Sequence, residues 1–154
     1  MDYLLIKTIH IISSTLLFGT GLGSAFYLWR ANQSKDLPSM LFAAKNVVIA
    51  DWLFTTPSVI IQPLTGFWMI HILHYPLTAT WIISSLLLYV LVGACWIPVV
   101  WMQIKMHRLV KTAVEQNQTL SPQYFKLARL WFILGWPAFI GVVVIFYLMV
   151  FKPT

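Results

Sequence analysis

The most regular set of chemically capable side chains in this sequence is a polar stripe in its second quarter. Asp51, Thr55, Ser58, Gln62, Thr65 and Met69 stand at offsets of 0, 4, 7, 11, 14 and 18. This spacing places them on one face of an α-helix. Two interpretations follow: a seam of hydrogen bonds between helices, or the wall of a polar pocket that carries a proton or a substrate. Pro57 and Pro63 interrupt the same segment and free backbone carbonyls for other partners.

A second stripe begins near the N-terminus. His10, Ser14, Leu17 and Gly21 stand at offsets of 0, 4, 7 and 11. One interpretation is a binding site, in which His10 offers a ring nitrogen and the small residues leave room for a flat ligand. The other is close contact between helices, which small residues permit.

The segments that carry these stripes are long and apolar. Of the 154 residues, 60% are hydrophobic and 9% are charged, whereas a soluble domain has about a quarter charged residues. Residues 8–29, 52–104 and 130–151 contain no Asp, Glu, Lys or Arg, and 74–78 divides the long middle run. A membrane-spanning helix needs roughly 20 apolar residues. We therefore expect a single all-α membrane domain over 1–154, with spans at about 4–29, 47–73, 80–104 and 130–151.

The distribution of basic residues predicts the orientation of these four spans. The net charge is +6, and eight of the ten basic residues fall in or beside the first and third loops. Basic loops face the cytoplasm, so both termini are expected on the non-cytoplasmic side. The same distribution argues against nucleic-acid binding and makes anionic lipid headgroups sufficient partners. The third loop, 105–129, is expected to continue the third helix and to start the fourth at Ser121 and Pro122.

This topology sorts the reactive side chains into two groups by depth. His10, Met69, His71 and His74 gather towards the outer end. Thioether and imidazole groups suit copper, so Met69, His71 and His74 are candidate metal ligands. Arg30, Asp51 and Gln103 gather towards the inner end. A carboxylate in a membrane needs a partner, for which Arg30 is expected first and Lys45 second.

The tryptophans and tyrosines near the predicted interfaces are typical of the aromatic belts that anchor membrane proteins. Trp29, Trp101 and Trp131 belong to this belt, whereas Trp96 lies deeper and is expected to pack inside. Cys95, the only cysteine, is expected to be a buried packing residue.

Several short segments resemble known families. Phe18-Gly19-Thr20-Gly21-Leu22-Gly23, Ala50-Asp51-Trp52, Gln62-Pro63-Leu64-Thr65-Gly66, Gly93-Ala94-Cys95-Trp96-Ile97-Pro98 and Leu134-Gly135-Trp136-Pro137 resemble an uncharacterised bacterial family of four-helix integral membrane proteins. That resemblance covers nearly the whole chain and implies a multi-pass protein of the bacterial inner membrane. Lys7-Thr8-Ile9-His10-Ile11-Ile12-Ser13, with Phe18-Gly19, is distantly similar to HemJ-type protoporphyrinogen oxidases and CopD-like membrane proteins. This second resemblance implies a b-type haem bound through His10.

The leading functional hypothesis is accordingly a haem b membrane redox protein, protoporphyrinogen-oxidase-like, with quinone or porphyrin as partner. His10 and either Met69 or His71 would be the axial ligands, with Ser14 and Gly21 beside the ring. Arg30, Asp51, Thr55, Gln62, Thr65 and Gln103 would form a polar pocket. The rival hypotheses are copper handling and a structural or assembly subunit, either a homo-oligomer or part of a larger membrane complex.

The predicted orientation is directly testable. A reporter that is active only in the cytoplasm should give signal when fused after Ser34 or Asn117, and none when fused after Thr154. The reason is the positive charge of the two loops that contain the first two sites. Signal from the C-terminal fusion would contradict an even number of spans with outside ends.

Overall fold

The protein folds into long antiparallel helices. The computed structural model describes residues 3–153, and all their regular structure is helical. The elements are α1 (Tyr3–Ser34), α2 (Leu37–Ala50), the π-helix η1 (Asp51–Thr55), α3 (Thr56–Ile72), α4 (Thr80–Glu115) and α5 (Pro122–Phe151). Because α2, η1 and α3 are continuous, four rods result, each long and apolar enough to cross a membrane. The prediction of an all-α protein with four spans is confirmed.

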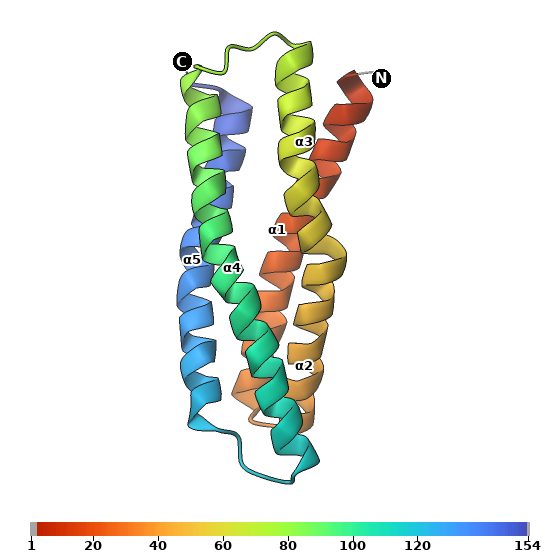
Figure 1. Cartoon of the computed structure of the whole chain (residues 1–154), viewed down its shortest axis with the longest axis vertical. Coiled ribbons are helices and arrows are strands. Elements are labelled where there is room, and N and C mark those ends of the chain that lie inside the picture. The colour runs from red at the N-terminus through yellow and green to blue at the C-terminus, as the bar shows by residue number, and fades with distance from the viewer. Residues whose placement is uncertain (1–2, 154) are drawn as a thin grey trace.

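The connections define the two ends of the bundle (Figure 1). Residue 3 and residue 153 lie at one end, together with the link from α3 to α4, and we call this the terminal end. The links from α1 to α2 and from α4 to α5 lie at the opposite end. We call it the basic end, since it carries most of the Lys and Arg residues. The orientation of these ends across the membrane remains a prediction.

Side-chain caps start both helices at the basic end. The Asp36 carboxylate accepts a hydrogen bond from the backbone N–H of Ser39 at 2.9 Å and starts α2. The hydrogen bonds from Ser39 hold the pKa of the Asp36 carboxyl group below its ordinary value. Ser121 accepts from the N–H of Gln123 at 3.2 Å and starts α5, as predicted.

The predicted first loop is wrong. The first helix was expected to end at about residue 29 and the second to begin at about 47, but α1 continues to Ser34 and α2 begins at Leu37. The prediction placed the helix boundaries where the uncharged runs end. A helix ends where its backbone groups find other partners, however, and charged residues can continue it into water. The cap at Asp36 marks the true boundary.

The core lies at the basic end, where four helices meet. Its members include Leu28, Met40, Val47, Met106 and Tyr124. Towards the terminal end, α1 packs on α3 and α4 packs on α5, while α3 and α4 make little contact (Figure 1). The bundle is therefore closed at the basic end and divided into two helix pairs above it.

One glycine allows the close approach of α4 and α5. A Cβ atom added to Gly141 would lie 2.6 Å from Val92 Cγ2, which is far inside van der Waals contact. Only a residue without a side chain fits at this position. The two helices of this pair are consequently held close together along the wall of the divided region.

Candidate functional site

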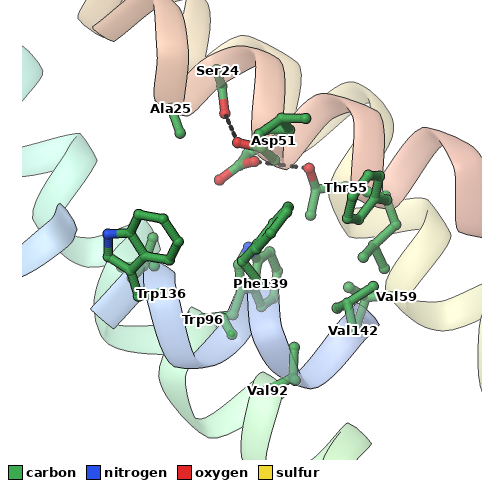
Figure 2. Close-up of a pocket in the computed structure, with 18 of the residues that line it drawn as sticks. Ser24, Ala25, Asp51, Thr55, Val59, Val92, Trp96, Trp136, Phe139 and Val142 are labelled. Atoms are coloured by element: carbon green, nitrogen blue, oxygen red, sulfur yellow. Dashed lines mark hydrogen bonds between the residues drawn. The ribbon is translucent and has the colours of Figure 1, made fainter. Parts of the chain in front are cut away.

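A cavity of about 580 Å³ lies in the divided region, between α1, α3, α4 and α5. Its walls are mostly aliphatic and aromatic, and they include Phe18, Trp96, Trp131, Trp136, Phe139 and Phe146. Figure 2 shows Asp51 and Thr55 on one side of this pocket and Val92 and Trp96 on the other. The volume falls within the range of small-molecule sites, roughly 300–1,000 Å³.

A buried carboxylate lies at the basic end of this cavity. Asp51 is 7% exposed, and its carboxylate accepts hydrogen bonds from Thr55 Oγ1 at 2.8 Å and from Gln103 Nε2. Gln103 Oε1 in turn accepts from Trp131 Nε1 at 3.0 Å. We call Asp51, Thr55, Gln103 and Trp131 the carboxylate chain. It joins η1, α4 and α5, and it gives each buried polar group a partner, as a low-dielectric environment requires.

The π-helix places Asp51 and Thr55. The N–H of Thr56 donates to the carbonyl of Asp51, five residues back. Pro57 follows, and its ring cannot donate a backbone hydrogen bond and clashes with the carbonyl four residues earlier in an α-helix. A wider turn before the proline relieves that conflict. Single π turns inside α-helices occur frequently at functional sites.

The polar stripe continues as a seam between α3 and α1. Gln62 Nε2 donates to the backbone carbonyl of His10 at 2.7 Å and to Ser13 Oγ at 2.5 Å. His10 Nδ1 lies 2.7 Å from Thr65 Oγ1. A Cβ on Gly66 would be 3.6 Å from His10 Cε1, an ordinary van der Waals contact, so α3 lies directly against the imidazole. With Asp51, Thr55 and Ser58 buried, the polar stripe faces protein as predicted.

One buried side-chain nitrogen in the described part of the chain makes no well-formed hydrogen bond. It is Nε1 of Trp96, on α4, and this residue lines the cavity. An indole nitrogen can only donate. Leaving such a donor without an acceptor costs about 1–3 kcal/mol. The cavity therefore presents a donor that a ligand oxygen could satisfy.

The structure brings together part of the predicted site. Ser14, Gly21, Asp51, Thr55, Gln62 and Gln103 all line the cavity. The remaining predicted residues lie outside it: His10, Met69, His71, His74, Arg30 and Thr65.

The predicted metal ligands at the terminal end lie outside the cavity. His71 and His74 are exposed, and Met69 is half-buried. Among residues 3–153, no three His, Cys, Asp or Glu side chains are placed to hold a metal ion. The cavity lining contains no His, Met or Cys at all.

The expected pairing of Asp51 with Arg30 is wrong. Arg30 is exposed, and its guanidinium lies 5.9 Å from the centre of the Trp29 ring. Lys45 is exposed as well. Both long side chains can keep their charge in water at the basic end, which is more favourable than entering the bundle. The neutral amide of Gln103 partners the carboxylate instead.

The sequence predicted part of the aromatic contribution to the site and missed the role of Trp131. Trp131 was predicted to be an interfacial anchor, yet it is buried and donates to Gln103. Tyr89 lines the cavity and donates to the carbonyl of Val59. The sequence does place Tyr89 on one helix face with Ser85, Trp96 and Gln103, at offsets of 0, 4, 11 and 18 from Ser85, and Tyr89, Trp96 and Gln103 all line the cavity. No periodic signal distinguishes Trp131 from an anchor.

Comparison with known proteins gives a family but no activity. A family described as "Predicted integral membrane protein (DUF2269)" matches residues 4–153. No curated protein and no solved structure is significantly similar to the chain. The resemblance to HemJ-type and CopD-like proteins is therefore not shown by these comparisons.

The carboxylate chain predicts that removing Gln103 alone is more destabilising than removing Gln103 and Asp51 together. Gln103→Leu should lower the free energy of unfolding by about 1–3 kcal/mol, because it removes one donor from the Asp51 carboxylate and leaves the indole N–H of Trp131 without its acceptor. The double variant Asp51→Val with Gln103→Leu should regain part of that loss. Gln33→Leu, at an exposed position of α1, is the matched control and should change stability little. Chemical unfolding in detergent measures all three, and additive losses would contradict the coupling.

Proposed function

The chain belongs to the DUF2269 family of predicted integral membrane proteins, and we propose that its function is to bind a membrane quinone. The observation that carries the proposal is the cavity, which combines flat aromatic walls with a free donor and a buried carboxylate. The ring of a quinone or of its quinol form is flat, apolar on both faces and polar at two opposite edges. The cavity offers flat apolar walls together with a polar group of each kind, the Trp96 donor and the Asp51 acceptor.

The free donor suits the oxidised ring. A quinone carbonyl oxygen accepts hydrogen bonds and cannot donate, so it requires an N–H or O–H from the protein. Trp96 Nε1 makes no well-formed hydrogen bond to a described atom, although the Asp51 carboxylate lies near it. The hydroxyl of Tyr89 and the amide nitrogen of Gln62 already donate to protein atoms. Trp96 is therefore the donor we assign to the quinone.

The carboxylate suits the reduced ring. A quinol hydroxyl donates a hydrogen bond and must lose its proton on oxidation. An ionised carboxylate has about four lone-pair sites. Thr55 and Gln103 each use one of those of Asp51, so acceptor capacity is left for a ligand. Asp51 would accept from the hydroxyl.

A haem b held by His10 is a second candidate function, and it is favoured by the contact with Thr65. Thr65 Oγ1 lies 2.7 Å from the carbonyl of Ile61, so it donates its proton there and accepts from His10 Nδ1. This network assigns the proton to Nδ1 and leaves a lone pair on Nε2, the form that binds a metal. His10 lies outside the cavity, however, and a haem there would occupy a different place from the quinone.

The role of Trp96 in quinone binding is tested by Trp96→Phe. This variant keeps an aromatic wall and removes the donor, so affinity for a short-chain benzoquinone should fall about 3- to 10-fold, the value of one net hydrogen bond. Equilibrium binding of radiolabelled quinone to the protein in nanodiscs is the measurement. Trp68→Phe, at an exposed position on α3, is the control and should bind within about twofold of the native chain.

Stability separates a binding effect from a folding effect. Trp96 Nε1 makes no well-formed hydrogen bond in the described chain, although Asp51 lies near it, so the melting temperature of Trp96→Phe should stay close to that of the native chain. Equal affinity of the native chain and Trp96→Phe would exclude Trp96 as the donor. No saturable binding by the native chain would refute the quinone proposal itself.

The absorption spectrum of the purified protein tests whether it binds haem. Protein purified from haem-replete cells should show a b-type absorption spectrum that His10→Ala abolishes or converts to high spin. Met69→Ala should perturb it, and His71→Ala should do so only if Met69 is not the second ligand. His107→Ala, in the part of α4 beyond the apolar run, is the control. Folded native protein without a Soret band would rule out a resident haem.

A further inference from the structure

We infer that the cavity opens sideways into the bilayer between α1 and α5, and that its ligand carries a long apolar tail that leaves through this opening. The inference rests on the proposed quinone site and goes beyond it. It specifies the class of ligand, a ring with an isoprenoid or similar tail, and the route by which the ligand reaches the ring site.

The opening follows from which lining residues are exposed. Six residues that line the cavity are also exposed on the outside of the bundle: Gly21, Leu22, Phe26, Trp29, Phe132 and Trp136. All six belong to α1 or α5. The lining residues on η1, α3 and α4 are all buried or half-buried. The cavity therefore meets the surroundings along one seam.

Two contacts between α1 and α5 bound this seam. At the basic end, the Tyr124 hydroxyl donates to Asn32 Oδ1 at 2.5 Å. Towards the terminal end, the rings of Phe18 and Phe139 stack with centroids 5.2 Å apart. The intervening stretch of α1 is roughly 20 Å long at ~1.5 Å per residue. All six exposed lining residues lie between these two contacts.

The other seams around the cavity are bridged. Gln62 and Thr65 bond α3 to α1. The Tyr89 hydroxyl donates to the carbonyl of Val59 and links α4 to α3. Gly141 lets α5 lie against Val92 of α4. The α3–α4 seam has few contacts besides the Tyr89 bond, but the lining residues along it are buried or half-buried, so the exposed lining residues mark the α1–α5 seam as the route to the ring site.

The opening leads directly to the carboxylate chain. Where two antiparallel helices lie side by side, the numbers of two residues at the same height have a constant sum. The contact of Asn32 with Tyr124 and that of Phe18 with Phe139 give almost the same sum, so they define one register of α1 against α5. On that register Trp131 is level with Phe26, and Gly135 is level with Gly21 or Leu22. A ring near Asp51 and Trp96 thus has its substituent at the opening.

The chemistry of the opening selects the substituent. The lining of the cavity, including Leu22, Phe26, Phe132 and Trp136 at the opening, contains no Lys, Arg or His. A ring with carboxylate side arms, such as a porphyrin, would place anions there without a cation to pair with. A flexible hydrocarbon tail crosses this apolar rim into lipid without losing any polar contact.

Two photoreactive benzoquinones with the same isoprenoid tail test this inference. One carries the reactive group on the ring and the other carries it on the first isoprene unit. In nanodiscs, the ring probe should label the walls around Trp96 and Val99, and the tail probe should label Leu22, Phe26, Phe132 or Trp136. Excess unlabelled quinone should suppress both, and peptide mass spectrometry locates the labels.

The outcomes separate this inference from the proposed function. Competable ring labelling with tail labels on the outer faces of α3 or α4, for example at Ile60 or Val90, would overturn the opening and keep the quinone site. Absence of competable labelling by either probe would refute both. A photoreactive phospholipid that labels the opening and is not displaced by quinone would identify a lipid acyl chain as the occupant and overturn the inference.

A pair of variants provides the matched control. Leu22→Trp fills the opening and should reduce tail labelling of Phe132 and Trp136 several-fold. Leu64→Trp adds the same bulk on the exposed face of α3, away from the cavity, and should leave the labelling unchanged. Equal labelling of the two variants would contradict passage of the tail between α1 and α5.

Discussion

The structure depends on the need to satisfy one carboxylate inside a membrane protein. Asp51 is buried, and hydrocarbon offers it no partner, so the bundle must supply hydrogen bonds at that height. Gln103 from α4 donates one of these hydrogen bonds, and Trp131 from α5 donates to the amide oxygen of Gln103. Three of the four rods are therefore joined at one height. From this layer to the basic end the helices pack as an ordinary apolar core. Beyond it they separate into two pairs.

The separation of the pairs creates the space that we propose for a ligand. Each pair is internally tight, since hydrogen bonds join α1 to α3 and Gly141 admits close packing of α4 and α5. Between the pairs, aromatic rings form the walls, and added Cβ atoms at Gly21 and Gly135 would meet nothing within 4 Å. A cavity of this kind beside a satisfied carboxylate and an unsatisfied indole suits a flat molecule with polar edges.

Local features of the chain were predictable from its sequence, and relations between helices were not. Apolar runs gave the four spans, Ser121 and Pro122 gave the start of α5, and periodicity placed Asp51 and Ser58 on a buried face. Periodicity cannot state which residue of another helix meets that face, so Arg30 was expected where Gln103 lies. The π turn before Pro57 and the cavity were equally invisible, because each depends on how whole helices meet.

The most direct test of this account compares two glycine variants in quinone binding. Gly135→Leu would project a side chain into the cavity, whereas Gly23→Leu would project an equal side chain from a glycine that does not line it, and neither Cβ meets a neighbour within 4 Å. In nanodiscs, Gly135→Leu should weaken binding of a long-tailed quinone by at least about tenfold, and Gly23→Leu by less than about twofold. Both variants should melt at the temperature of the native chain. Equal affinity of the two folded variants would contradict a quinone site in this cavity.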